Sequence, residues 1–256
     1  MKTIYTSLVI LSIFTLAYTP SFAQRVNPLF SKSIIHRKAS MGFEYGFGVA
    51  SIQLNEINQR LEELQIGQLT NLQANIPLHL YFEGANGLGV SFDVHASISP
   101  QNEVYKRNTN LDFYTMGFGA TVHIPIIYSN RVGVWATGGI RSNSMYFQYN
   151  YNTNSSANFA NLLTNPATDN HSINLLSSAN EMAAFGGKFQ YRFWRKDKMK
   201  NHEIRVGVNS EYNYPLSQGP WRERSSKAVI TDMPNINPKN LSFNLTLTLL
   251  LTLKEH

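Results

Sequence analysis

Cysteine is absent from this chain of 256 residues. The protein therefore has no disulfide framework, no thiolate metal site and no lipidated N-terminal cysteine. Charged residues are sparse too, at 15 % of the chain. The formal net charge is +6, but the basic residues are scattered apart from a cluster at 195–200, which we interpret as a solvated turn. This distribution does not indicate a nucleic-acid-binding surface, and we expect no nucleic-acid partner.

Long apolar runs are also missing. A membrane-spanning helix needs about 20 apolar residues, and the apolar run at 8–14 near the N-terminus is much shorter. It follows Lys2 and precedes the small-x-small sequence 21–23, which is the pattern of a secretory signal. We predict a cleaved signal peptide at 1–23 and a periplasmic N-terminal segment at 24–40.

What the chain does have is eight stretches in which apolar and polar residues alternate. A period of two is typical of β-strands with two different faces. The clearest case is 88–99, where Val90, Phe92 and Val94 alternate with Ser91 and Asp93. The predicted strands are 41–54, 72–83, 88–99, 111–127, 132–149, 182–194, 202–214 and 241–253.

The connections between these strands are alternately long and short. Short turns are expected at 84–87, which contains an Asn-Gly pair suited to tight hairpins, and at 129–130. Pro125 removes a ladder hydrogen bond, so we expect a bulge or a strand end there. The long connections are 55–71, 100–110, 150–181 and 215–240. Three groups of apolar residues in them have helical spacing and are expected to cap the barrel mouth: Ile57, Leu61 and Leu64; Phe159, Leu162 and Leu163; and Ile173, Leu175 and Leu176.

Alternation alone does not separate a membrane barrel from a soluble one. Strands of 12 or more residues match a tilted crossing of the bilayer. Glycine is dense on the polar faces (Gly46, Gly48, Gly117, Gly119, Gly139), where it leaves room in a narrow lumen. Aromatic residues gather near strand ends, which favours two interfacial girdles: Tyr128 and Trp194 at the short turns, and Tyr105, Tyr149, Tyr151, Tyr212 and Tyr214 at the long loops.

With these features, residues 41–253 resemble the small eight-stranded outer-membrane β-barrels of Gram-negative bacteria, of the OmpA and OmpX type, and we predict a barrel domain at 41–254. The resemblance lies in the architecture rather than in a motif. It implies an all-β, antiparallel, up-and-down transmembrane barrel in the cell outer membrane. In this class the long loops are extracellular.

Charged and imidazole side chains fall on the polar faces. An eight-stranded barrel is only just wide enough for side chains to fill, so we expect a salt-bridge network rather than a general pore. Glu211 is expected to pair with Lys188 or Arg192, and Arg205 with Glu44, Glu83 or Asp93. The predicted lumen residues are Glu44, His79, Glu83, Asp93, His95, His123, Arg141, Lys188, Arg192, Arg205 and Glu211.

Two sites of chemistry can be considered. His95 and Ser97 share one strand face, and Glu83 or Glu103 is a candidate orienting carboxylate for a nucleophile and base pair of the kind that acts on lipid A. His79, His95 and His123 are candidates for a metal site. Neither pattern has a specific spacing, so we predict no catalytic, cofactor or metal residues.

The favoured function is therefore a non-enzymatic outer-membrane barrel with a filled polar lumen and with loops for structural or binding roles. Its expected partners are outer-membrane lipids and an extracellular ligand or protein bound by the long loops, and we expect a monomer. The alternative is a lipid-modifying enzyme (lipid A acyl hydrolase or acyltransferase) or a narrow transporter.

Overall fold

The computed structural model describes residues 39–99, 102–105, 109–129, 131–152, 170–194, 202–231, 233–234 and 236–252. The predicted signal peptide, almost all of the N-terminal segment and the candidate helix around Phe159 lie outside these residues. No helix in the described part of the chain is long and apolar enough to cross a membrane.

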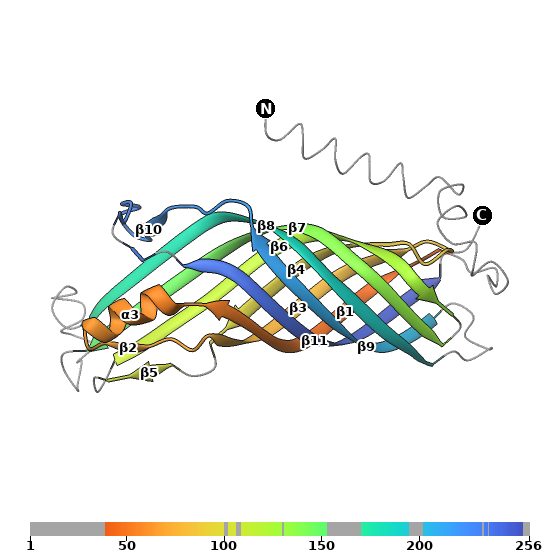
Figure 1. Cartoon of the computed structure of the whole chain (residues 1–256), viewed down its shortest axis with the longest axis horizontal. Helices are drawn as coiled ribbons and strands as arrows, with labels where there is room; N and C mark the ends of the chain where they lie inside the picture. The colour runs from red at the N-terminus through yellow and green to blue at the C-terminus, as the bar shows by residue number, and fades with distance from the viewer. Residues whose placement is uncertain are drawn as a thin grey trace, which may run out of the picture.

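Eight antiparallel strands form a closed barrel (Figure 1). Each strand pairs with its neighbours in sequence, and β1 (Ser40–Gln53) closes the ring by pairing with β11 (Asn237–Thr252). This confirms the predicted up-and-down barrel. The other six strands of the wall are β3 (Leu72–Glu83), β4 (Gly89–Ile98), β6 (Thr109–Tyr128), β7 (Val132–Asn152), β8 (Asn170–Trp194) and β9 (His202–Pro215).

Short turns join the strands at one end of the barrel, which we call the turn end. The hairpin at 84–87 is closed by the Gly84 amide, which donates to the Leu88 carbonyl at 2.8 Å, and Gly87 has a φ of 84°. Positive φ is the reason a glycine fits this turn. A register shift between Pro125 and Ile127 confirms the predicted bulge.

That bulge corrects one expectation for the girdle. An extra residue in a strand reverses the direction of every side chain beyond it. Ile126 and Ile127 are both exposed on the outside. Tyr128, predicted to face lipid, turns inward instead and donates a hydrogen bond to Glu83.

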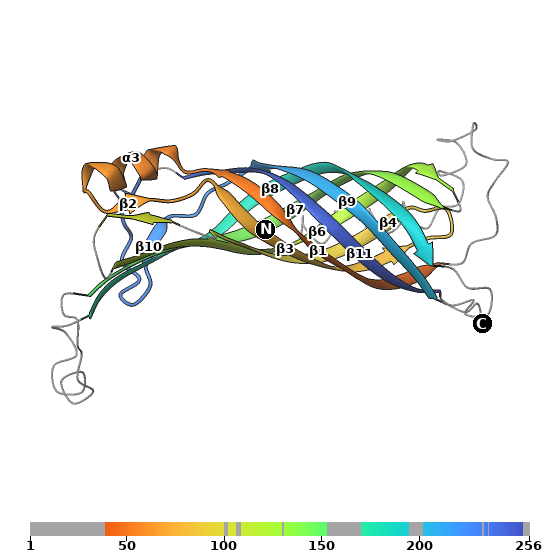
Figure 2. The same cartoon turned by 90° about the horizontal axis from the view of Figure 1, so that it is seen from below.

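The opposite end, which we call the loop end, carries longer strands and extra elements (Figures 1 and 2). Strand β8 pairs with β9 only from Met182 onward, but it continues back to Asn170 along β7. The predicted helix through Ile173, Leu175 and Leu176 is therefore wrong. Pairing with the extended β7 on one side and with β10 (Trp221–Glu223) on the other holds this segment as a strand.

An apolar cap fills the loop end. The helix α3 (Asn55–Glu63) buries Ile57 and Leu61, as predicted, whereas Leu64 is exposed. The short strands β2 (Gly67–Gln68) and β5 (Glu103–Val104) pair beside it. The buried residues of this apolar cap are Ile52, Leu54, Ile57, Leu61, Leu69, Leu111, Phe113, Met145, Phe147, Tyr149, Leu175, Trp221 and Ile236.

Between the two ends, the barrel is apolar outside and polar inside. Phe118 and Leu245 are each 67 % exposed on the outer surface, whereas Arg205 and Lys188 are each 1 % exposed in the lumen. A wall of this kind is stable only when lipid covers its outer face. The chain is thus a transmembrane barrel of the outer-membrane type.

The aromatic girdle is present in part. Tyr212 and Tyr214 of β9 are exposed near the loop end, as an interfacial belt requires, whereas Tyr105 is exposed next to β5, among the extra elements of the loop end. Tyr149 belongs to the buried apolar cap instead. The side chains of Tyr151 and Trp194 lie outside the described part of the structure.

Candidate functional site

The lumen contains the residues that the alternation assigned to it. All eleven are buried, with exposures of 7 % or less, which confirms the predicted polar interior. They are Glu44, His79, Glu83, Asp93, His95, His123, Arg141, Lys188, Arg192, Arg205 and Glu211.

Inward glycines provide the space for the long side chains of the lumen. A Cβ atom added at Gly119 would lie 2.6 Å from Cγ of Arg141, and one at Gly46 would lie 2.6 Å from Cγ of Pro77. Both distances are shorter than carbon atoms tolerate. The glycines on the polar faces therefore leave space for the side chains of neighbouring strands, as the sequence indicated.

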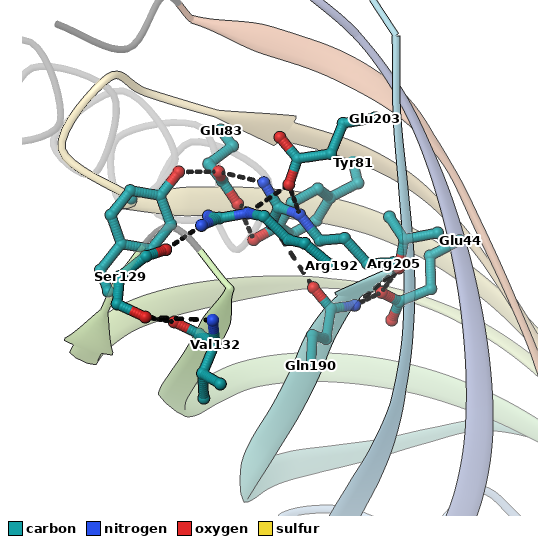
Figure 3. A network of polar contacts seen from close by, with 12 residues as sticks. Glu44, Tyr81, Glu83, Ser129, Val132, Gln190, Arg192, Glu203 and Arg205 are labelled. Carbon is teal, nitrogen blue, oxygen red and sulfur yellow. Dashed lines mark hydrogen bonds and ion pairs between the residues drawn. The ribbon is translucent and has the colours of Figure 1, made fainter. Parts of the chain in front are cut away.

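A network of charges crosses the lumen near the turn end (Figure 3). Arg205 of β9 donates two hydrogen bonds to Glu83 of β3, from Nη1 to Oε2 at 2.6 Å and from Nη2 to Oε1 at 2.7 Å. Its Nε also contacts Glu203 at 2.7 Å, and Glu203 forms a second ion pair with Arg192. Glu83 was one of the three partners predicted for Arg205, whereas Glu203 was missed.

A second pair lies beside the first. Nζ of Lys188 is 2.5 Å from Oε2 of Glu44. The same carboxylate oxygen accepts hydrogen bonds from Gln190 at 2.7 Å and from Thr248 at 2.6 Å. Gln190 also accepts from Arg205 at 3.4 Å, so it links the two ion pairs. Every described acid and base of this network therefore has a partner, as a buried charge requires.

Three aromatic side chains, which we call the aromatic plug, lie in the lumen near the turn end: Tyr81, Tyr128 and Trp135. Trp135 donates from Nε1 to the Gly87 carbonyl at 2.8 Å and so ties the plug to the short turn. The cations lie over these rings. Lys188 is 4.1 Å from the Tyr81 ring centre, and Arg192 is 4.8 Å from that of Tyr128, both within cation–π range.

A third charge cluster lies in another part of the lumen. Arg141 of β7 contacts Asp93 at 2.9 Å and Glu211 at 2.7 Å, and it donates to Asn213 at 3.4 Å. The expectation that Glu211 pairs with Lys188 or Arg192 is therefore wrong. Those two cations are taken by Glu44 and Glu203.

The candidate nucleophile and base are not assembled with an acid. Ser97 donates its hydroxyl hydrogen to Asn75 at 2.9 Å. In the ladder Glu83 lies opposite Gly89, six residues along β4 from His95. That separation corresponds to about 20 Å along a strand. The other candidate acid, Glu103, is exposed on β5 at the loop end.

The three histidines do not converge on a metal site. No group of three or more metal-ligating side chains occurs among the described residues. Nε2 of His123 shares a hydrogen bond of 2.9 Å with the Ser91 hydroxyl. His79 lies between Glu44 and Asp93 in the strand register, and neither of its ring nitrogens has a hydrogen-bond partner.

Known proteins give only distant likenesses. No protein-family model matches the chain, and no curated protein matches it. Neisserial surface protein A is similar in structure, with 10 % identity and a TM-score of 0.44 over 84 % of this chain and 97 % of its own. Ail, the attachment invasion locus protein of Yersinia pestis, has 12 % identity and a TM-score of 0.39 over 85 % and 99 %. A major outer membrane protein of Thermus thermophilus has 12 % identity and a TM-score of 0.42 over 84 % and 99 %.

The assignment as an eight-stranded outer-membrane barrel rests on the chain itself: its strand order, its apolar outer face and its charged interior. The lumen and the loop end are the two places where function can lie. The charges of the lumen are paired with one another, whereas the loop end presents charged residues to solvent.

Proposed function

We propose that this protein is a non-enzymatic outer-membrane barrel that does not conduct and that acts through the surface of its loop end. The observation that carries the proposal is the pairing of charges across the lumen, above all Arg205 with Glu83 and Lys188 with Glu44. Each pair joins strands from different sides of the ring and occupies the space that a solute would need.

The two ends of the barrel also support the proposal that it does not conduct. The aromatic plug lies over the turn end, and the apolar cap packs at the loop end. An ion that crossed the barrel would have to pass an apolar cluster, which is unfavourable for a charge that has lost its water. The working surface of the protein is then the loop end, whose ligand or partner is extracellular.

Liposome swelling and lipid analysis test this proposal together. Liposomes that contain the purified barrel should exclude small sugars and amino acids as empty liposomes do. Cells with and without the protein should have the same lipid A acyl pattern. Solute uptake that depends on the protein would contradict the sealed lumen, and a changed acyl pattern would contradict the non-enzymatic role.

A narrow transporter is the second candidate, because one observation favours it. Several buried polar atoms of the lumen have no hydrogen-bond partner among the described residues, including both ring nitrogens of His79, Thr137 Oγ1, Asn209 Oδ1 and Thr246 Oγ1. Buried polar groups are normally satisfied by protein or by water. A hydrated stretch between the closures is consistent with these atoms and would be the start of a path if either closure opened.

A further inference from the structure

A small hairpin at the loop end is firmly mounted on the barrel. It comprises residues 221–230, and we call it the basic hairpin. Strand β10 pairs with the extension of β8, and the Arg224 amide donates to the Asn174 carbonyl at 2.9 Å. Trp221 anchors it by burial in the apolar cap. The Ile230 amide closes the hairpin on the Trp221 carbonyl at 2.9 Å.

The basic hairpin presents three exposed cations, Arg222, Arg224 and Lys227. None of them forms an ion pair with a residue that the structure describes. The hairpin has one acid, Glu223, and its carboxylate turns back into the turn. It accepts from the Ser225 hydroxyl at 2.6 Å and from the Ser226 amide at 2.5 Å. These hydrogen bonds lower the pKa of Glu223 to about 2.

Among the described residues of the loop end, the basic hairpin and helix α3 differ in charge. Helix α3, on another side of the same end (Figures 1 and 2), carries the acids Glu56, Glu62 and Glu63 against the single base Arg60. Arg60 is paired with Glu63 at 2.9 Å. In the part of the loop end that the structure describes, α3 is therefore acidic and the basic hairpin is basic, which is a pattern for orienting a charged partner.

The height of the basic hairpin above the membrane indicates which kind of partner it can reach. Tyr214, in the exposed tyrosine belt, pairs with Ala183 of β8, whereas Trp221 pairs with Ser177 further out. Along the partner strand β7 these levels are five residues apart, from Met145 to Ile140, which corresponds to roughly 12 Å along the membrane normal. The headgroup layer is only about 5–8 Å thick on each side. The cations thus lie above the headgroups of the bilayer.

We propose that the basic hairpin binds a sulfated or phosphorylated polysaccharide that lies above the membrane surface. This inference rests on the proposed function, because it identifies the partner class of the loop end. Arg222 and Arg224 can each pair with successive anionic groups of an extended chain, since guanidinium groups suit sulfate and phosphate oxygens. Lys227 adds a third contact from the other arm.

Binding of dextran sulfate to the full-length barrel in neutral detergent tests the proposal. The variant Arg224→Gln/Lys227→Gln should bind at least about fivefold more weakly than the wild type at low salt, because two exposed charge contacts are lost. The matched control Arg60→Gln/Arg131→Gln removes the same charge from exposed sites elsewhere and should change binding less than about twofold. Neutral dextran should not bind.

Equal losses in the two variants would mean that bulk charge, not the hairpin, is responsible, and would overturn the proposal. So would an absence of dextran sulfate binding by the wild type. A second arm titrates the soluble lipid dihexanoyl phosphatidylglycerol. If the hairpin variant lost only that binding, the partner would be a lipid headgroup and the polysaccharide would be excluded. Solute uptake or a changed acyl pattern would count against the proposed function and leave this binding result intact.

Discussion

Arg205 and Glu83 face each other across the lumen and are joined by two hydrogen bonds of 2.6 and 2.7 Å, although 122 residues separate them in the chain. Glu83 also accepts from Tyr81 at 3.0 Å and from Tyr128 of the aromatic plug. The pair therefore connects the salt-bridge network to the closure at the turn end. Loss of this pair should lower the unfolding temperature of the barrel and leave its insertion into the membrane intact.

Replacement of Arg205 by alanine tests this role. The variant leaves Glu83 buried without its cation, which costs about 3–5 kcal/mol for a fully buried pair and less where water can enter. Thermal unfolding in detergent should shift to a lower temperature, and membrane insertion should persist. The control Arg131→Ala removes an exposed guanidinium and should unfold with the wild type. An unchanged unfolding temperature for Arg205→Ala would show that the pair is not structural.

The outward face can be tested at Val94, which is 56 % exposed on β4. Arginine there would lie in the hydrocarbon layer and should reduce folding stability by about 2–4 kcal/mol if the site is near the midplane. Urea titration of barrel folding into lipid vesicles measures the loss. The variant Glu62→Arg places the same side chain on the exposed surface of α3 and should fold like the wild type. Equal stability of the two variants would contradict the assigned lipid face.

Topology can be tested because the chain has no cysteine of its own. Ser226→Cys places a thiol at the tip of the basic hairpin, and Ala85→Cys places one in the short turn; both positions are exposed. A membrane-impermeant maleimide added to intact cells should label the first and spare the second, because long loops of this class are extracellular. Broken cells should show labelling of both. Labelling of Ala85→Cys in intact cells would mean that the orientation is reversed.

The aromatic plug can be tested at Trp135, a buried side chain whose Nε1 donates to the turn at Gly87. Trp135→Ala leaves a large cavity and should cost about 3–5 kcal/mol of unfolding free energy. Trp135→Phe keeps most of the apolar volume and should lose much less, since only the hydrogen bond and a small space are removed. Guanidinium unfolding of both variants compares these effects. Equal losses would show that packing does not hold the plug.

Much of the fold followed from the sequence, because a period of two specifies strands and their faces directly. The strand at 72–83 and all eleven lumen residues were predicted correctly. Tyr128 was assigned to the wrong face. The extra residue of the bulge at Pro125 reverses the alternation beyond it, and the simple period of two does not include that reversal. The β8 extension was missed because its pairing with β7 and β10 outweighs a local spacing that suits a helix.

The partners within the lumen were harder to predict than its members. Pairs such as Arg141 with Glu211 join strands that are not adjacent, and their contact depends on how far neighbouring strands are staggered around the ring. The alternation carries no information about that stagger. Glu203 and Gln190 were not included among the lumen residues, yet both link ion pairs at the turn end. Only the three-dimensional register shows these links.

Single-channel recording of the wild-type barrel in a planar lipid bilayer tests the sealed lumen most directly. With Arg205 and Glu83 paired and the aromatic plug closed, the inserted protein should give a current indistinguishable from that of the bare bilayer. Incorporation is checked in parallel bilayers that contain the Ser226→Cys variant, whose basic hairpin is accessible to added maleimide. Stable, ion-selective current steps from the wild-type protein would contradict the account and would make a narrow channel the better description.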